Sequence, residues 1–243
     1  MTAELRQIWQ EAFGDSDETL DRFAATGFCP DRCHYICDGN TPVSALYWFD
    51  CELDGQKLAY IYAVATRASH RGQGLAQRLM AEAHEILKKQ GYAGAILVPG
   101  EKGLFEFYKK IGYRVATKAE AFSAVAADCP VSINQISPTE YTTWRRNYLP
   151  QGGVRQEGET LSYLATYAKF YKGEDFLLVA TKEEETLLVH EILGNTDACG
   201  HILCALACKT GRFRTPGTSL NFAMYFPFTD TCPVPGYFGL ALD

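Results

Sequence analysis

The sequence has no long apolar run and no basic tract, and these two absences narrow the classes of protein to consider. Its longest apolar segments fall well short of the roughly 20 residues that span a bilayer. Its first residues lack the charged and apolar regions of a secretory signal. The 23 Lys and Arg are outnumbered by 29 Asp and Glu, which gives a net charge of −6 and argues against phosphate-backbone binding. We therefore expect a cytoplasmic protein that contacts neither membranes nor nucleic acid.

The composition also argues against disorder. Hydrophobic residues make up 47% of the chain and charged residues 21%, which is typical of soluble globular proteins. A length of 243 residues leaves one large domain or two small ones open, and either can bury a core of its own.

Cysteine is abundant, and its nine copies raise the question of disulfides or metal. Reduced thiols are expected because nothing in the sequence directs export. Two cysteine triplets each lie near a histidine: Cys29, Cys33 and Cys37 near His34, and Cys199, Cys204 and Cys208 near His201. The first spacing departs from the C-x2-C pairs of structural zinc sites, and the second is explained more simply by buried thiols packing as small apolar groups. We expect no metal site.

Hydrophobic spacing and turn residues predict a mixed α/β fold in the first half of the chain. Helices are expected at 3–13, 17–26, 75–90 and 103–112, and strands at 33–38, 42–50, 58–66 and 95–98, with extended chain at 113–125. The helix that ends before Gly91 has the clearest amphipathic pattern.

The second half has a similar order of elements without a convincing residue-by-residue repeat. Helices are expected at 139–148, 159–170 and 197–209, and strands at 175–182, 186–193, 218–226 and 236–242. Two prolines and a weak helical period at 127–141 indicate a junction there. We therefore predict two domains, residues 1–128 and 129–243.

One segment carries a clear chemical signal, residues 64–76, where an apolar strand enters a long helix through a glycine-containing turn. The first turn of a helix presents unpaired backbone N–H groups and the positive end of the helix dipole, so it can hold a diphosphate. Gly72 and Gly74 would allow a ligand close to the backbone. Arg71 and Arg78 could add charge-assisted hydrogen bonds. Taken alone, the glycines could equally serve only the conformation of the turn.

Two motifs resemble those of the GCN5-related N-acetyltransferase (GNAT) superfamily. Arg71, Gly74 and Ala76 match the Q/R-x-x-G-x-G/A signature, and residues 104–113 look like its F-Y-x-x-x-G-F/Y segment. The resemblance runs over residues 3–125, and the opening helices, the LYWFD strand and the ILVPGEKG loop look most like the Eis-type branch. A dinucleotide-binding turn would need a third glycine that RGQGLAQ does not supply.

The resemblance implies a fold, a cosubstrate and a set of site residues. The fold is the GNAT fold, a mixed central sheet flanked by helices, and the cosubstrate is acetyl-CoA. Backbone groups of Val64, Ala65 and Thr66 would pair with the pantetheine arm. The pyrophosphate would be held by Arg71 and by the amides of Gly72, Gln73, Gly74, Leu75, Ala76 and Gln77. Tyr108 matches the tyrosine that protonates the departing thiolate, although the alternative is an aromatic residue packed on its helix.

The general base is not evident from the sequence. Many relatives carry a carboxylate on the strand before the signature, where this chain has Tyr60 and Tyr62. The carboxylates considered instead are Asp50, Glu52, Glu101 and the terminus at Leu242-Asp243, the last by analogy with the Eis-type branch. The family's usual first strand has no counterpart here, and Ala68 replaces a common proline.

The second half implies a degenerate GNAT-like lobe. At 195–200, where a second lobe would bind pyrophosphate, there is no arginine and no glycine pair. The leading hypothesis is an enzyme that transfers acetyl from acetyl-CoA to a primary amine of a small molecule by direct attack. The alternative is a non-catalytic CoA-binding sensor or interaction protein. The negative charge suits a cationic acceptor, and a homo-oligomer is compatible with the sequence.

Overall fold

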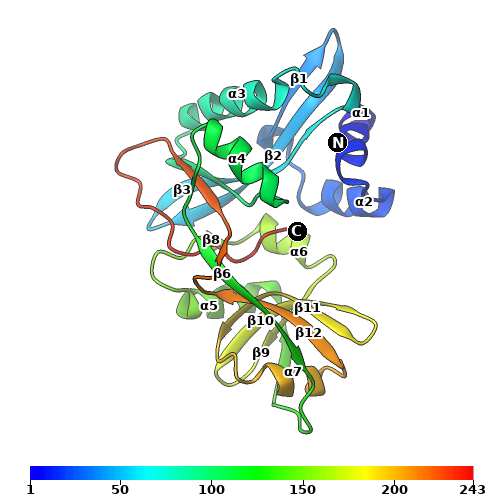
Figure 1. Ribbon diagram of the computed structural model, residues 1–243, viewed down its shortest axis with the longest axis vertical. Helices are drawn as coiled ribbons and strands as arrows, with labels where there is room; N and C mark the ends of the chain where they lie inside the picture. Colours follow the sequence, from blue (N-terminus) through cyan, green and yellow to red (C-terminus); the bar gives the residue numbers. More distant parts are fainter. Residues whose placement is uncertain (243) are drawn as a thin grey trace. The chain divides into compact units, whose positions relative to one another are not determined.

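Two mixed β-sheets organise the chain in a computed structural model that describes residues 1–242 (Figure 1). The first compact unit comprises Met1–Arg114, Gly158–Tyr163 and Met224–Pro233. The second comprises Val115–Glu157, Leu164–Ala223 and the described residues from Val234 onward. The α/β class expected from the sequence is confirmed. The division into residues 1–128 and 129–243 stays a prediction, and the two compact units interleave along the chain.

The sheet of the first unit follows the order β1-β2-β3-β4-β14-β5. The pairs β1–β2, β2–β3 and β4–β14 are antiparallel, whereas β3 and β4 are parallel, and a parallel pair needs a crossover, which α3 provides. The strands are β1 Cys33–Asp38, β2 Thr41–Leu53, β3 Gln56–Thr66, β4 Gly94–Leu97, β14 Met224–Pro227 and β5 Arg114–Val115. The helices of this unit's main segment are α1 Ala3–Phe13, α2 Asp17–Thr26, α3 Leu75–Lys89 and α4 Lys102–Lys110, with 3-10 turns at Pro30–Arg32 and Ala68–His70.

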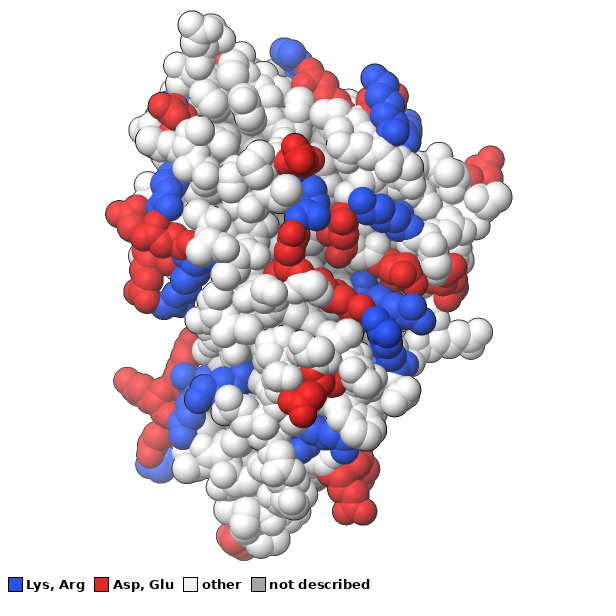
Figure 2. All heavy atoms as spheres, turned by 180° about the vertical axis from the view of Figure 1, so that it is seen from behind, with Lys and Arg blue, Asp and Glu red and all other residues white. Residues whose placement is uncertain are grey.

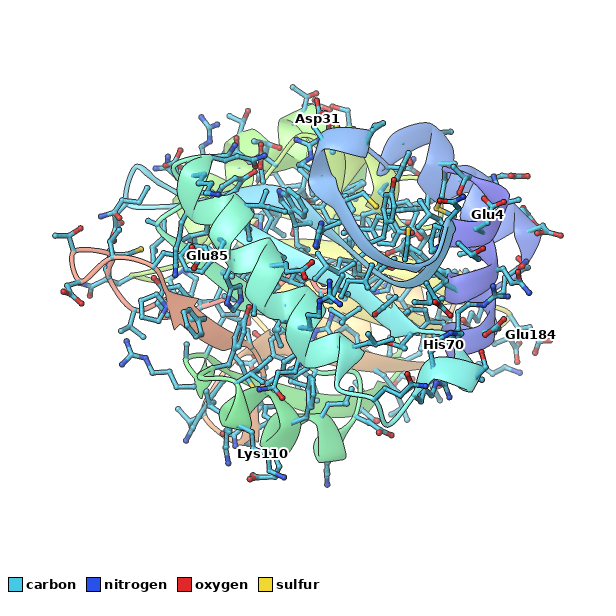
Figure 3. All side chains as sticks on the ribbon, turned by 90° about the horizontal axis from the view of Figure 1, so that it is seen from above. Glu4, Asp31, His70, Glu85, Lys110 and Glu184 are labelled. Atoms are coloured by element: carbon cyan, nitrogen blue, oxygen red, sulfur yellow. The ribbon has the colours of Figure 1, made fainter. Side chains whose placement is uncertain are left out.

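Local capping explains where the opening helices begin. The Thr2 and Ser16 side chains accept backbone N–H groups in the first turns of α1 and α2, and Gly14 ends α1 in the left-handed conformation at φ 73°. Leu5 and Ile8 of α1 then pack against Ala45 and Ala65 of β2 and β3. In Figure 3, α3 crosses the strands from the turn at His70 towards Glu85.

The sheet of the second unit follows the order β13-β6-β12-β11-β10-β9-β7. Here β11 and β12 are parallel and joined through α7, so this unit repeats the strand-helix-strand crossover of the first. Its core packs α7 against β10, β11 and β12. The strands are β6 Lys118–Val125, β7 Asn134–Ile136, β9 Lys169–Lys172, β10 Phe176–Glu183, β11 Thr186–Gly194, β12 Thr210–Pro216 and β13 Leu220–Asn221. The remaining elements of the chain are α5 Pro138–Tyr148, β8 Arg155–Gln156, α6 Glu159–Leu164 and α7 Cys199–Ala205.

Several expected elements of the second half differ from the structure. The helix expected at 159–170 is cut short as α6, because Lys169–Lys172 pairs with β10 as strand β9. The expected strand at 218–226 is divided into β13 and β14, and the helix at 197–209 is only the seven residues of α7. The segment expected as a strand at 236–242 is not one: side chains hold it, since Gln156 receives the Leu240 N–H and donates to its carbonyl.

Charged side chains are distributed without a basic patch on the face in Figure 2, where Lys and Arg lie beside Asp and Glu. The exposed Lys209 and Glu185 side chains form one of the surface ion pairs, at 2.7 Å. Within residues 1–242, no helix has the length and apolarity that crossing a membrane requires.

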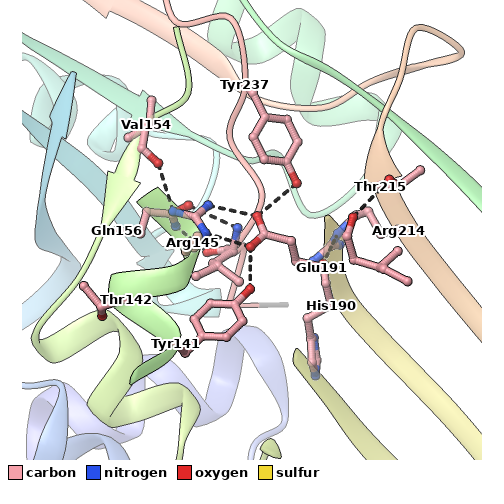
Figure 4. Close-up of polar contacts among 12 residues, drawn as sticks. Tyr141, Thr142, Arg145, Val154, Gln156, His190, Glu191, Arg214, Thr215 and Tyr237 are labelled. Atoms are coloured by element: carbon pink, nitrogen blue, oxygen red, sulfur yellow. Dashed lines mark hydrogen bonds and ion pairs between the residues drawn. The ribbon is translucent and has the colours of Figure 1, made fainter. Parts of the chain in front are cut away.

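A buried carboxylate holds the second unit together (Figure 4). Glu191 of β11 is fully buried and accepts two hydrogen bonds from Arg145 of α5, at 2.7 and 2.9 Å. The hydroxyls of Tyr141 and Tyr237 donate to the same carboxylate at 2.6 and 2.9 Å. Arg145 also donates to the Val154 carbonyl at 3.2 Å. Every partner is satisfied, so the cluster fixes β11, α5 and the chain around residue 237 to one another.

We expect Glu191→Gln to destabilise the second unit by about 3–5 kcal/mol, because it leaves the Arg145 guanidinium buried without its anion. Glu157→Gln is the matched control, since Glu157 pairs with Arg146 at the surface and such pairs contribute about 0.2–1 kcal/mol. Urea denaturation of both variants measures the difference. Equal stability losses would contradict a dominant role for the buried cluster.

His84 is the buried titratable group of α3. Its Nε2 lies 2.8 Å from the Tyr113 hydroxyl, and its ring packs between Phe226 at 4.5 Å and Phe228 at 5.2 Å. Burial lowers the pKa of His84 from 6.5 to about 4, so the folded protein holds it neutral.

Stability should therefore depend on pH through His84. His84 takes up a proton near pH 6.5 in the unfolded chain but only near pH 4 in the folded protein. The stability of the folded state that depends on a neutral His84 is therefore fully present above pH 6.5 and is lost as the pH falls towards 4. The loss is about 3 kcal/mol at most. His84→Gln retains a hydrogen-bonding side chain but does not titrate, so its melting temperature should fall less than that of the unmutated protein between pH 6.5 and 4. Parallel falls would show that other groups dominate.

Candidate functional site

Strand β3 separates from β4 partway along its length. The two strands pair only through Leu58–Tyr60 and Gly94–Ile96. The register with β2 then shifts between Ala45 and Tyr47, opposite Ala63, which has a positive φ of 48°. This geometry is that of a β-bulge, which bends the strand and increases its twist. Beyond it, β3 still pairs with β2, but within residues 1–242 no strand pairs with its other edge.

The open edge includes Val64, Ala65 and Thr66, the residues expected to bind the pantetheine arm. On the β2 side, Ala65 and Thr66 pair with Ala45 and Ser44. Val64 and Thr66 are half-buried, whereas residues 58–61 of the same strand are buried. An extended ligand can therefore add to this edge as another strand would, through backbone hydrogen bonds.

The turn after β3 leads into an N-terminus of α3 that no side chain caps. Gly72 and Gly74 have φ values of 77° and 76°, and no atom lies within 4 Å of where a Cβ would stand on either. Gly74 is the N-cap residue and its helix has no side-chain capping bond. The first-turn N–H groups of α3, which belong to Leu75, Ala76 and Gln77, therefore have no side-chain cap. Gln73, which precedes the N-cap residue, is exposed. This is a ready arrangement for an anion.

Arg71 lies in this turn, but its side chain bonds the protein's own backbone. Its Nε donates to the Thr66 carbonyl and its Nη2 to the Glu11 carbonyl, both at 3.2 Å. The guanidinium therefore holds the turn against α1 while its charge stays beside the amides. Arg78 is 63% exposed along its side chain and bonds Glu82 at 2.7 Å.

Glu11 fixes the same turn from α1. Its carboxylate accepts the Ala68 N–H at 3.1 Å and pairs with Arg67 at 3.1 Å. The bond from the Ala68 amide is the main reason that the pKa of Glu11 is lowered, and the Arg67 and Arg71 charges add to it. Sequence reasoning missed Glu11, because its only signal is a carboxylate in an otherwise ordinary amphipathic helix.

Tyr108 is buried in α4, with 7% of its surface exposed. Its ring contacts Phe107 and Tyr113 edge to face, at 5.1 and 5.8 Å. Burial raises the pKa of Tyr108 to about 12, so its hydroxyl keeps its proton throughout the neutral range. Tyr113 in turn bonds His84 of α3, which links the position of α4 to α3.

Of the carboxylates considered as general bases, Asp50 is engaged by other side chains, Glu52 is half-buried and Glu101 is exposed. Asp50 accepts the Tyr92 hydroxyl at 2.5 Å and contacts Arg32 and Lys57 at 3.3 and 3.4 Å. Glu101 is the exposed N-cap residue of α4 and makes no capping bond. Of the terminal pair, Asp243 lies outside the described residues. Among the described residues, no group of three or more His, Cys, Asp or Glu is placed to hold a metal ion, and all nine cysteines are free.

On the sheet face carrying Tyr60 and Tyr62, the structure adds a residue from the second half of the sequence. Tyr163 of α6 is hydrogen-bonded to Tyr62, and its ring centroid lies 6.4 Å away. The hundred-residue separation left no local signal for this pair.

In the second unit, side chains bond the strand edge that corresponds to the open edge of β3. Its β11 also shifts register, between Val179 and Ala180 of its partner β10. Beyond the shift, Arg214 Nε donates to the His190 carbonyl at 2.9 Å and Thr215 Oγ1 to the Ile192 carbonyl at 3.0 Å. Side chains of β12 therefore bond two backbone acceptors of β11 beyond the register shift.

Comparisons with known proteins agree with this geometry. Residues 2–116 match the family model described as an acetyltransferase (GNAT) domain. The fold is similar to a GCN5-related N-acetyltransferase from Kribbella flavida, with a TM-score of 0.69 and 17% identity over 91% of this chain and 67% of that one. For a GCN5-related N-acetyltransferase from Anabaena variabilis the TM-score is 0.71 and the identity 12%, over 93% of this chain and 70% of that one. For Eis1 from Mycobacterium abscessus the TM-score is 0.61 and the identity 12%, over 90% of this chain and 66% of that one. A search of curated proteins finds no match.

These matches confirm the expected GNAT fold with two GNAT-like lobes. The chain spans about two thirds of the length of the three solved structures. At these identities the likeness is one of fold, and the likeness to Eis1 supports the Eis-type branch only in part.

Proposed function

We propose that the chain, whose residues 2–116 match the GNAT acetyltransferase domain, transfers acetyl from acetyl-CoA to a primary amine of a small molecule. The match supports acetyl-CoA as cosubstrate. The observation that carries the proposal is the continuity of the open β3 edge with the uncapped N-terminus of α3. One extended ligand with a diphosphate can occupy both.

The cosubstrate's two parts are assigned to consecutive segments. Backbone groups of Val64–Thr66 bind the pantetheine arm, and the amides from Gly72 to Gln77 bind the pyrophosphate. Arg71 acts by holding the turn and by adding positive charge next to those amides. The second unit does not bind CoA in this proposal, since Arg214 and Thr215 fill the corresponding gap.

The reaction is a direct attack without an acetylated enzyme. The amine nitrogen forms a bond to the acetyl carbon, the C–S bond breaks, and the sulfur leaves with the electron pair. Tyr108 donates its proton to that sulfur; its hydroxyl is protonated at neutral pH because burial raises its pKa to about 12. Holding the two reactants in line supplies much of the rate enhancement.

The acceptor is proposed to be cationic, because the protein carries a net charge of −6. We further propose a cytoplasmic location and kinship with the Eis-type branch. The opening helices and the fold likeness to Eis1 support that branch.

Acetyl-CoA should bind to the unmutated protein in titration calorimetry, and Arg71→Glu should abolish the binding. The substitution releases the turn from Thr66 and Glu11 and puts a negative charge beside the diphosphate. Arg212→Glu, at an exposed site in the second unit, is the charge-matched control and should bind as the unmutated protein does. No heat of binding with the unmutated protein would exclude the proposal.

Turnover should fall in Tyr108→Phe because that variant cannot protonate the thiolate. We expect kcat to drop about 100-fold, within the range for general acids, with the dissociation constant for acetyl-CoA unchanged. A thiol-release assay across a panel of amines makes the measurement. Turnover that falls in this way excludes the alternative of a non-catalytic CoA sensor, whereas acetyl-CoA binding without turnover on any amine would favour the sensor.

A further inference from the structure

Helix α6 brings one tyrosine from the second half of the sequence into the first unit. Tyr163 is 3% exposed, and its ring centroid lies 5.4 Å from that of Phe23 and 6.4 Å from that of Phe49. Its neighbour Glu159 forms an ion pair with Arg32, which anchors α6 beside the start of β1. Its hydroxyl bonds Tyr62 of β3. The first unit is therefore completed on this face by a segment that the family match does not cover.

Tyr62 lies on the far side of Val64–Thr66 from the turn proposed to bind the pyrophosphate, so the acetyl end of the cosubstrate would follow on its side. It directly precedes the bulge residue Ala63, and it is half-buried between the buried Ile61 and the open stretch that begins at Ala63. Its ring is held by Trp9 at 5.5 Å and Phe49 at 5.7 Å. A fixed hydroxyl at this position can meet the amine that attacks a thioester lying along the open edge.

The carboxylate of Asp15 belongs to the same cluster as this tyrosine pair. Asp15, in the α1–α2 linker, accepts the Trp9 Nε1–H at 2.6 Å and is half-buried, so it still exchanges with solvent. Burial is the main reason that the pKa of Tyr163 is raised; the hydrogen bond to Tyr62 opposes this, and the Asp15 charge adds to it. Trp9 thus contacts both Asp15 and Tyr62, at the two ends of one small cluster.

We infer that Tyr62, Tyr163 and Asp15 form the path by which the acceptor amine loses its proton, in place of a carboxylate on β3. This inference rests on the proposed acetyl transfer. As the C–N bond forms, the nitrogen gives its proton to the Tyr62 oxygen, Tyr62 passes its own proton to the Tyr163 oxygen, and Tyr163 passes a proton to the Asp15 carboxylate, with water bridging the last transfer. Asp15 then releases the proton to solvent. Both tyrosines end neutral, and no oxidation or reduction takes place.

The test compares hydroxyl deletions that keep the rings. Tyr62→Phe and Tyr163→Phe are assayed with the best alkylamine from the panel and with its analogue bearing fluorine atoms next to the aminomethyl carbon, which makes a much weaker base. We expect kcat for the alkylamine to fall about 10- to 100-fold in each variant, and the loss to be under about threefold for the fluorinated amine, whose proton leaves readily. The double variant should be no slower than either single one, because both deletions break the same path.

Tyr47→Phe is the matched control, since Tyr47 belongs to the same aromatic cluster, 5.3 Å from Trp9, while its hydroxyl faces the Met1 sulfur. It should retain the kcat of the unmutated protein. Asp15→Asn keeps an oxygen for the Trp9 N–H and removes the proton acceptor, so it gives a second reading should a tyrosine variant fold poorly. It should reproduce the selective loss with the alkylamine.

The outcomes separate this inference from the proposed function. If the unmutated protein acetylates no amine, the proposed function fails. If it acetylates amines and both tyrosine variants and Asp15→Asn keep its kcat, only the proton path is overturned. Equal losses with the alkylamine and its fluorinated analogue would also overturn the path, because they would show that the hydroxyls orient the acceptor without moving its proton.

Discussion

The separation of β3 from β4 after Tyr60 is the constraint on which the site depends. Three residue pairs hold the strands together, and the bulge at Ala63 turns the rest of β3 away. A left-handed alanine costs of order 1 kcal/mol or more, so it persists only because the flanking pairs with β2 are fixed. The bulge leaves this part of β3 without a second neighbouring strand, whereas continuous pairing with β4 would have consumed its backbone groups.

Helix α1 keeps the open edge of β3 and the turn before α3 in position. Glu11 bonds the Ala68 amide and Arg67, and Arg71 reaches back to the Glu11 carbonyl, so the first helix and the turn form one bonded assembly. Trp9, two residues earlier on α1, contacts Asp15 and Tyr62. Helix α1 thereby connects the turn proposed to bind the cosubstrate with the aromatic cluster proposed to meet the acceptor, through Glu11 and Arg71 at the turn and through Trp9 at the cluster.

Local patterns predicted the first half well and the second half less well. The amphipathic period of α3 and the turn glycines located this helix and the turn before it, because both depend on residues adjacent in sequence. Strand β9 and the split between β13 and β14 depend on pairing with distant strands, and the stretch at 236–242 is held by the Gln156 and Glu191 side chains. Arg71 was expected to face the ligand, whereas its bonds go to backbone carbonyls, a choice that only three-dimensional proximity to Glu11 determines.

The interleaving of the two units bears on how the chain matures. Strand β14, from Met224 to Pro227, lies between β4 and β5, so the first sheet closes only after residues near the end of the described chain are available. Domains of larger proteins commonly fold in order as they leave the ribosome. Here the segment that matches an acetyltransferase domain leaves the β4 edge unpaired until the second unit has been synthesised. All four residues of β4 are buried in the folded protein. During that interval β4 is an unpaired edge strand, which can pair with another chain, so we expect the nascent chain to benefit from a chaperone.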